Sequence, residues 1–203
     1  MTAIMKSVSP RICEKVANGD CTILVSKTAP KCEMPFKCYI YCTSAKPYLY
    51  KEANPPFELF LDSELYKGKG YDDRLFSSKV IGEFVCDWIT KITPSCDIDG
   101  CVNQYTHGYP AILGDNDCLS FNDMKAYLGN KKGYDWHISD LKIYDKPKEL
   151  SEFKKTKERI ARTCGMQARN GLCRAIDHEE LCDNIKCCFK TPCPPQSWCY
   201  IES

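Results

Sequence analysis

The sequence lacks the long apolar runs of membrane-spanning and secreted proteins. No stretch approaches the ~18 consecutive apolar residues that a transmembrane helix needs. The opening residues, MTAIMKSVSPRICEKVANGD, contain neither an apolar core nor a small-residue cleavage site of the kind found in signal peptides. We therefore expect a cytoplasmic protein whose cysteine thiols stay reduced.

A large net charge is lacking as well. Lys and Arg number 28 against 27 Asp and Glu, which gives a net charge of +1 and no global attraction to nucleic acid or membranes. Any basic surface must therefore be local. The most basic stretch, KKTKERIAR, predicts contacts with nucleic-acid phosphates, and the alternative is a solvated helix face. Its cationic residues are Lys154, Lys155, Lys157, Arg159 and Arg162.

Cysteine, in contrast, is abundant. The chain has 16 cysteines, about 8% of its residues, which is close to the level of disulfide scaffolds. Several of them cluster near the C-terminus among residues too polar to form a core. A structural zinc ion would order such a segment, and free thiols or disulfides are the alternatives. The spacing contains no CxxC, and the predicted ligands are Cys173, Cys182, Cys187 and Cys193.

Strands outnumber helices in the first 147 residues. Alternating or β-branched stretches predict strands at 3–8, 21–27, 36–43, 79–89 and 134–147, the last with a slip near Ser139 and Asp140. One helix is expected after Ser9 and Pro10, and a second after Ser120. Two segments, 44–78 and 93–117, have the composition of loops.

This pattern predicts a small curved sheet or partly open barrel with two covering helices, an α+β fold. The composition changes after Pro147, so we expect a barrel domain over 1–147. The remaining residues, 148–203, would hold the basic segment, the cysteine-rich extension and a closing strand in PPQSWCYIES.

Several stretches in order resemble one family. They are SVSPRICEKVANGDCTILVSKTAPK, PFKCYIYCT, KVIGEFVCD, YLGNKKGYDWHISDLKIYDKPKELSEF and PPQSWCYIE. Together they resemble the ASCH-domain proteins of phages and prophages. The resemblance implies a PUA-like β-barrel that binds RNA or modified nucleosides, in the host cytoplasm if the protein is phage-encoded. A few related proteins are hydrolases.

The family signature, Gly-x-Lys-Thr-x-Glu-x-Arg, is altered in this chain. Gly19 and Thr22 match it, but the lysine position is Cys21, the Glu position is Leu24 and the Arg position is Ser26. In the hydrolases of the family the lysine and the Glu position are catalytic. The resemblance therefore implies that hydrolysis is not carried over, although a thiol can also act as a nucleophile if a neighbour lowers its pKa.

Other residues of the cleft are candidates for ligand contact. Glu83 interrupts an apolar strand and is either a ligand contact, a general base or a salt-bridged residue. Trp136 and His137 point to opposite faces, so that Trp136 stacks on a base or fills the core, and His137 is a candidate acid or base. The full predicted set is Cys21, Thr22, Lys27, Tyr39, Tyr41, Glu83, Trp136 and His137.

The function expected from these patterns is binding of RNA or a nucleotide-like ligand in the barrel cleft, without a membrane partner. The alternatives are a hydrolase acting on a modified nucleoside, or an anti-defence or regulatory factor that binds a host protein and uses the barrel as a scaffold. The expected cofactor is one structural zinc ion.

Overall fold

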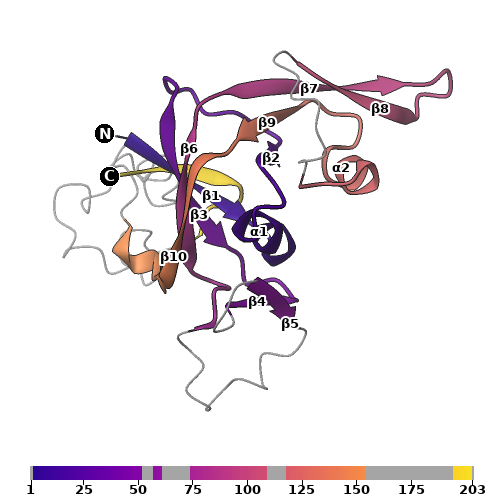
Figure 1. Cartoon of the computed structure of the whole chain (residues 1–203). Helices are drawn as coiled ribbons and strands as arrows, with labels where there is room; N and C mark the ends of the chain where they lie inside the picture. Colours follow the sequence, from indigo (N-terminus) through magenta and orange to yellow (C-terminus); the bar gives the residue numbers. More distant parts are fainter. Residues whose placement is uncertain (1, 52–56, 61–73, 109–117, 154–193, 203) are drawn as a thin grey trace, which may run out of the picture.

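A computed structural model describes residues 2–51, 57–60, 74–108, 118–153 and 194–202. These residues form mostly β-structure with two α-helices, an α+β fold as predicted (Figure 1). Within these ranges no helix is both long and apolar enough to cross a membrane. The division at residue 147 and the cysteine-rich extension stay predictions.

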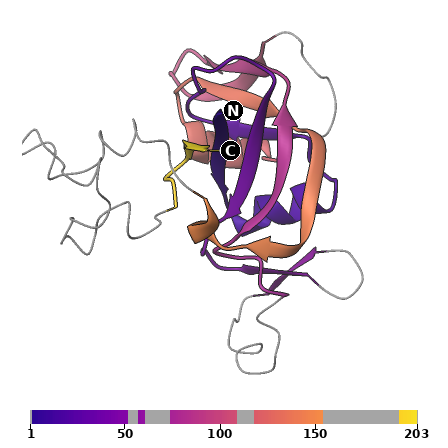
Figure 2. The ribbon, with the colours of Figure 1, turned by 90° about the vertical axis from the view of Figure 1, so that its left-hand side faces the viewer.

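A five-stranded sheet forms the body of the molecule. Its strands, in spatial order, are β10 (Ser139–Lys148), β6 (Val80–Cys86), β3 (Phe36–Cys42), β1 (Thr2–Val8) and β11 (Trp198–Glu202). Only β1 and β3 are parallel, and the other neighbours are antiparallel. Figure 2 shows these strands side by side. The C-terminal strand was correctly predicted to close the sheet, since β11 pairs with β1 along its length.

A second sheet contains four antiparallel strands. They are β2 (Ile23–Ser26), β9 (Gly133–His137), β7 (Ile89–Cys96) and β8 (Val102–His107). A separate pair, β4 (Tyr48–Lys51) and β5 (Phe57–Phe60), lies at the opposite end of the molecule from the β7–β8 hairpin (Figure 1). The segments 44–78 and 93–117, predicted to be loops, therefore contain strands. In β8 the exposed positions do not alternate with buried ones, which hid the strand from pattern analysis.

The two predicted helices are present. Helix α1 (Pro10–Ala17) starts with proline at its first position and buries Cys13 and Val16. Helix α2 (Phe121–Leu128) is capped by Ser120, whose side chain accepts a hydrogen bond from the Asp123 backbone N–H at 3.2 Å. Met124 and Leu128 are buried, but Phe121 and Tyr127, which were predicted to share the apolar face, are exposed.

Two chain segments pass from one sheet to the other at a shared corner. One runs from β6 through Asp87 and Trp88 into β7, and the other runs from β9 through Ile138 into β10. Each was predicted to be one continuous strand, and that prediction was wrong because an apolar run does not reveal a change of sheet. The predicted slip lies at the second crossing, where Asp140 has a φ of 47°.

Hydrogen bonds tie the two crossings together. The His137 backbone N–H donates to Trp88 O at 3.2 Å, and Ser139 Oγ donates to Val85 O at 2.9 Å. The His137 ring stacks on Trp88 with centroids 4.6 Å apart, and its Nδ1 lies 2.6 Å from Asp87 Oδ1. Strands that bend between sheets commonly form such corners. His137 and Asp87 thus join the two bends.

We expect a double-mutant cycle of Asp87→Ala and His137→Ala to show a coupling free energy of about 1 kcal/mol in urea unfolding, because the pair links two bends of the chain. The matched control is the Lys51–Asp145 pair, in which Asp145 is fully exposed. That pair should show less coupling. Equal coupling in the two cycles would contradict a structural role for the histidine pair.

Candidate functional site

The least expected residue of the interior is Lys6, at the centre of β1. Strand alternation places it in the row of Ile4 and Val8, and it is only 3% exposed. Its neighbour across the β1–β11 ladder is Trp198. Within the described part of the chain, its ammonium group makes no hydrogen bond or ion pair. A buried ammonium without a counter-charge is costly, so it needs a physical or functional explanation.

The Lys6 ammonium faces the aromatic ring of Trp136. Its Nζ lies 4.4 Å from the ring centroid of Trp136 in β9, a cation–π contact. Trp136 is completely buried, with Phe36 at 5.7 Å and Trp198 at 6.0 Å between ring centroids. The Trp136 Nε1 donor has no hydrogen-bond partner among the described residues. The Trp136 ring, with its buried donor, and the Lys6 ammonium thus lie close together, and neither donor has an acceptor among the described residues.

Two thiols, Cys38 and Cys86, complete the surroundings of Lys6. Burial lowers the pKa of Lys6 to about 8, and the two thiols act in the opposite direction. Burial also raises the pKa of Cys38 well above its usual range and that of Cys86 to about 12. Both thiols therefore stay protonated near neutral pH and provide no anion for the lysine. We define the Lys6 site as Lys6, Cys38, Cys86, Trp136 and Trp198.

A loop of residues 27–35 borders this site and is held to β11. Trp198 Nε1 donates to Thr28 Oγ1 at 2.9 Å, and the Tyr200 hydroxyl accepts from the Lys31 backbone N–H at 2.9 Å. Trp198 is half-buried, as is Cys32 of the loop, which packs against the same core. The inner part of the Lys6 site, formed by Lys6 and Trp136, is therefore buried. Its rim, at Trp198 and Cys32, is partly exposed.

The residues of the altered signature do not belong to the Lys6 site. Cys21 is buried and forms a disulfide with Cys118, so its sulfur is not a free nucleophile and the expectation that every thiol is reduced does not hold for this pair. Their Cα atoms lie 5.2 Å apart, a distance that suits a disulfide. Thr22 contributes its backbone carbonyl to Ile138 N–H at 2.8 Å. Lys27 is exposed and covers the Tyr127 ring at 4.7 Å.

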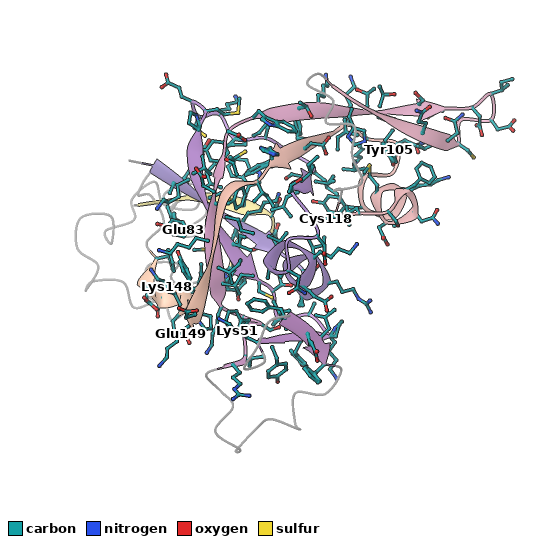
Figure 3. All side chains as sticks on the ribbon, in the orientation of Figure 1. Lys51, Glu83, Tyr105, Cys118, Lys148 and Glu149 are labelled. Carbon is teal, nitrogen blue, oxygen red and sulfur yellow. A yellow bond between two sulfur atoms is a disulfide. The ribbon has the colours of Figure 1, made fainter. Side chains whose placement is uncertain are left out.

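Glu83, Tyr39 and Tyr41 lie on the other face of the five-stranded sheet, because their positions alternate with those of the core residues. Figure 3 shows Glu83 on the side away from α1. Its carboxylate accepts from Lys37 Nζ at 3.1 Å and from the Tyr144 hydroxyl at 2.7 Å. Burial acts to raise the pKa of Glu83, but these two hydrogen bonds outweigh it and lower the pKa. Glu83 is thus ionised and salt-bridged, which was the alternative to a catalytic role.

The predicted aromatic platform is largely covered. Tyr41 is buried, and Tyr39 packs against Phe153 with ring centroids 5.0 Å apart. Trp136 and His137 do point to opposite faces, as predicted. However, Trp136 has no exposed ring face for a base, which agrees with core packing rather than stacking. The predicted ligand residues therefore do not converge on one cleft.

Pattern analysis missed a second carboxylate–histidine pair. His107 Nδ1 of β8 lies 2.5 Å from Asp135 Oδ2 of β9, and Thr90 Oγ1 of β7 donates to the same oxygen at 3.5 Å. Asp135 is 1% exposed. No local signal could have found this pair, because its members come from separate strands that only the four-stranded sheet brings together.

Two predicted sets lie outside the described residues. They are the basic residues Lys154, Lys155, Lys157, Arg159 and Arg162, and the zinc ligands Cys173, Cys182, Cys187 and Cys193. In the described ranges, no group of three or more His, Cys, Asp or Glu residues is placed to hold a metal ion. The zinc hypothesis stays a prediction.

Comparison with known proteins gives only distant similarities. No family model matches the chain, and no curated protein matches it. Among solved structures, a mutant ASCH protein from Zymomonas mobilis with phenylalanine in place of a tyrosine is similar, with a TM-score of 0.49 and 13% identity over 98% of this chain and 90% of that one. The unmodified Zymomonas mobilis ASCH structure gives 0.48 and 13%, with 98% and 87% covered. Similarity at this level assigns no residue role or activity to the chain.

We expect Lys6→Met to raise the free energy of unfolding at pH 7 by about 2–3 kcal/mol, measured in urea. The pKa of about 8 in the folded chain lies below that of an unfolded lysine, about 10.4, so unfolding takes up a proton between these pH values. The cost of the buried ammonium is therefore fully present below pH 8 and is lost towards pH 10.

The difference in free energy of unfolding between Lys6→Met and the unmodified chain should accordingly become smaller as the pH rises. The thiols titrate in both proteins, and Lys6→Met removes the ammonium that lowers the pKa values of Cys38 and Cys86. The control is Lys37→Met, in which an exposed lysine paired with Glu83 is removed without relief of burial. A Lys6→Met chain that is less stable than the unmodified chain at pH 7 would contradict the description of Lys6 as an uncompensated buried charge.

Proposed function

We propose that the chain is an ASCH-like binding protein of the PUA-like type, and that its ligand is RNA or a nucleotide-like molecule held at the Lys6 site. The observation that carries this proposal is the buried Lys6 ammonium, which faces Trp136 and has no acceptor in the described part of the chain. A ligand that brings an acceptor oxygen to Nζ would offset the cost of burying this charge.

The chemistry around Lys6 favours a ligand with both acceptors and a flat ring. Lys6 Nζ and Trp136 Nε1 are donors only, so they match carbonyl or phosphate oxygens. Trp198 is half-buried at the rim and lies next to Lys6 across the ladder, where an indole can stack on a base. A nucleotide carries phosphate oxygens as acceptors and a flat aromatic base, and every common base except adenine adds carbonyl oxygens.

Binding is favoured over the hydrolysis seen in some members of the resembled family. The catalytic positions implied by the resemblance are the bonded Cys21 and the buried Leu24, and the arginine position is the buried Ser26. None of the three offers a free charged group. Release of cytidine from N4-acetylcytidine would favour the hydrolase alternative instead. The phage or prophage origin and a host protein partner stay expectations.

The proposal predicts that Lys6→Met weakens binding of a short single-stranded RNA by about 10–100-fold at low salt, the usual effect of losing a hydrogen bond to a charged group. Trp198→Ala should weaken binding by about 1–3 kcal/mol through loss of stacking. Isothermal titration calorimetry with AMP, UMP and a ten-nucleotide RNA measures both effects. Trp198 serves here because truncating the fully buried Trp136 would disturb the core.

The matched control is Lys37→Met, since Lys37 is a cation of the same sheet on its other face. Its removal should leave AMP and UMP affinity unchanged. RNA binding that persists unaltered in Lys6→Met would overturn the assignment to the Lys6 site. Absence of binding to all three probes would favour the protein-partner alternative.

A further inference from the structure

We propose that four exposed lysines beside the Lys6 site bind the phosphate backbone of a single-stranded RNA, so that the ligand is a strand and not a free nucleotide. We define the basic strip as Lys27 and Lys31 of the 27–35 loop together with Lys131 and Lys132, which precede β9. The proposal rests on the proposed function for the nucleotide held at the Lys6 site. It rests on the placement of the basic strip for the strand that continues from that nucleotide.

The ladder between β2 and β9 brings three of these lysines to one end of the four-stranded sheet. At this end the ladder stops with the pair Ser26 and Tyr134. In an antiparallel pair, the residues that follow one strand and those that precede the other lie at the same end. Lys27 follows β2 at this end, and Lys131 and Lys132 precede β9 there. Their charges are therefore gathered in one place, although they lie about a hundred residues apart in the sequence.

Helix α2 and the 27–35 loop connect this end of the sheet to the rim of the Lys6 site. Lys27 Nζ lies 4.7 Å from the ring centroid of Tyr127, whose hydroxyl hydrogen-bonds with the Lys27 backbone and the Ser197 side chain. Ser197 directly precedes Trp198, the stacking residue of the proposed function. Lys31, further along the loop, is bonded to β11 through its backbone N–H. A strand with one base on Trp198 therefore has its neighbouring phosphates beside the basic strip.

The charges of the basic strip are not neutralised within the described part of the chain. Other surface lysines pair with carboxylates, namely Lys37, Lys51 and Lys79 at 3.1, 3.2 and 3.4 Å. The four lysines of the basic strip form no such ion pair with a described residue. The 27–35 loop contains a single acid, Glu33, and the nearby Asp123 of α2 is bonded to Ser120.

A row of unpaired cations beside a stacking ring is complementary to a phosphate backbone with accessible bases. The bases of a duplex are stacked inside the helix, so none of them could reach the half-buried Trp198. The placement of the basic strip next to Trp198 therefore favours a single strand over a duplex.

The salt dependence of binding by the full chain tests the proposal. Affinity for a ten-nucleotide uridine RNA is measured by fluorescence anisotropy from about 50 to 200 mM salt. The variants are Lys27→Met/Lys31→Met and Lys131→Met/Lys132→Met. Each removes two phosphate contacts, so the slope of log K against log salt should become shallower by about 1.4. Over this range the affinity of each variant should therefore fall about sevenfold less than that of the unmodified chain.

The matched control is Lys146→Met/Lys148→Met, which removes two exposed lysines of β10. Lys148 makes the same kind of contact as Lys27, with its Nζ 4.7 Å from the Tyr144 ring centroid. This control should keep the slope of the unmodified chain. An unchanged slope in both variants of the basic strip, or an equal loss of slope in the control, would overturn the proposal.

Removal of the acid in the loop should have the opposite effect. Glu33→Gln should raise RNA affinity about two- to fivefold at low salt, because it removes one repulsive charge. A decaglutamate peptide carries negative charge without bases, and we expect it to bind more weakly than the RNA. Peptide binding as tight as RNA binding would overturn the assignment to nucleic acid in favour of an acidic protein partner.

AMP separates this proposal from the proposed function. Both variants of the basic strip should bind AMP like the unmodified chain, because a single nucleotide does not extend along the strip. RNA binding that depends on the strip but persists in Lys6→Met would support this proposal and count against the Lys6 site. AMP binding that is lost in Lys6→Met, with an RNA slope that the strip variants do not change, would overturn this proposal alone. An unmodified chain that binds no RNA would overturn both.

Discussion

The interior of this protein depends on the corner at which two strands change sheets. The bends at Asp87–Trp88 and at Ile138 turn β7 and β9 away from the five-stranded sheet and bring Trp136 over its inner face. The stacked His137 and Trp88 rings and the Asp87 contact hold the two bends together.

The corner has a chemical consequence at Lys6. Apolar side chains from both sheets and from α1 form one core cluster, and Lys6 lies in the same row of β1 as two of its members. Burial of this charge therefore lowers the free energy of unfolding of the chain. Proteins tolerate such a charge where it contacts a ligand or takes part in a reaction. The neighbouring thiols, both protonated, leave that charge uncompensated.

Local patterns predicted the elements better than their assembly. The helix starts at Pro10 and Ser120 and the closing strand at Trp198 follow from capping chemistry and alternation, which act over a few residues. The burial of Trp136 was one of two readings that the sequence left open. Lys6 was overlooked because a lysine within a short apolar strand is normally exposed, and only the second sheet covers it. The Asp135–His107 pair likewise depends on strand neighbours that no local pattern specifies.

The Lys6 ammonium is buried without a partner among residues 2–51, 57–60, 74–108, 118–153 and 194–202, and the central claim is that a ligand supplies one. The most direct measurement is an NMR titration of the Lys6 side chain in the free protein and in the protein saturated with AMP. The account predicts a pKa near 8 in the free chain, which rises towards the ordinary lysine value when a phosphate or carbonyl oxygen contacts Nζ. An ordinary lysine pKa in the free chain, unchanged by AMP, would contradict it.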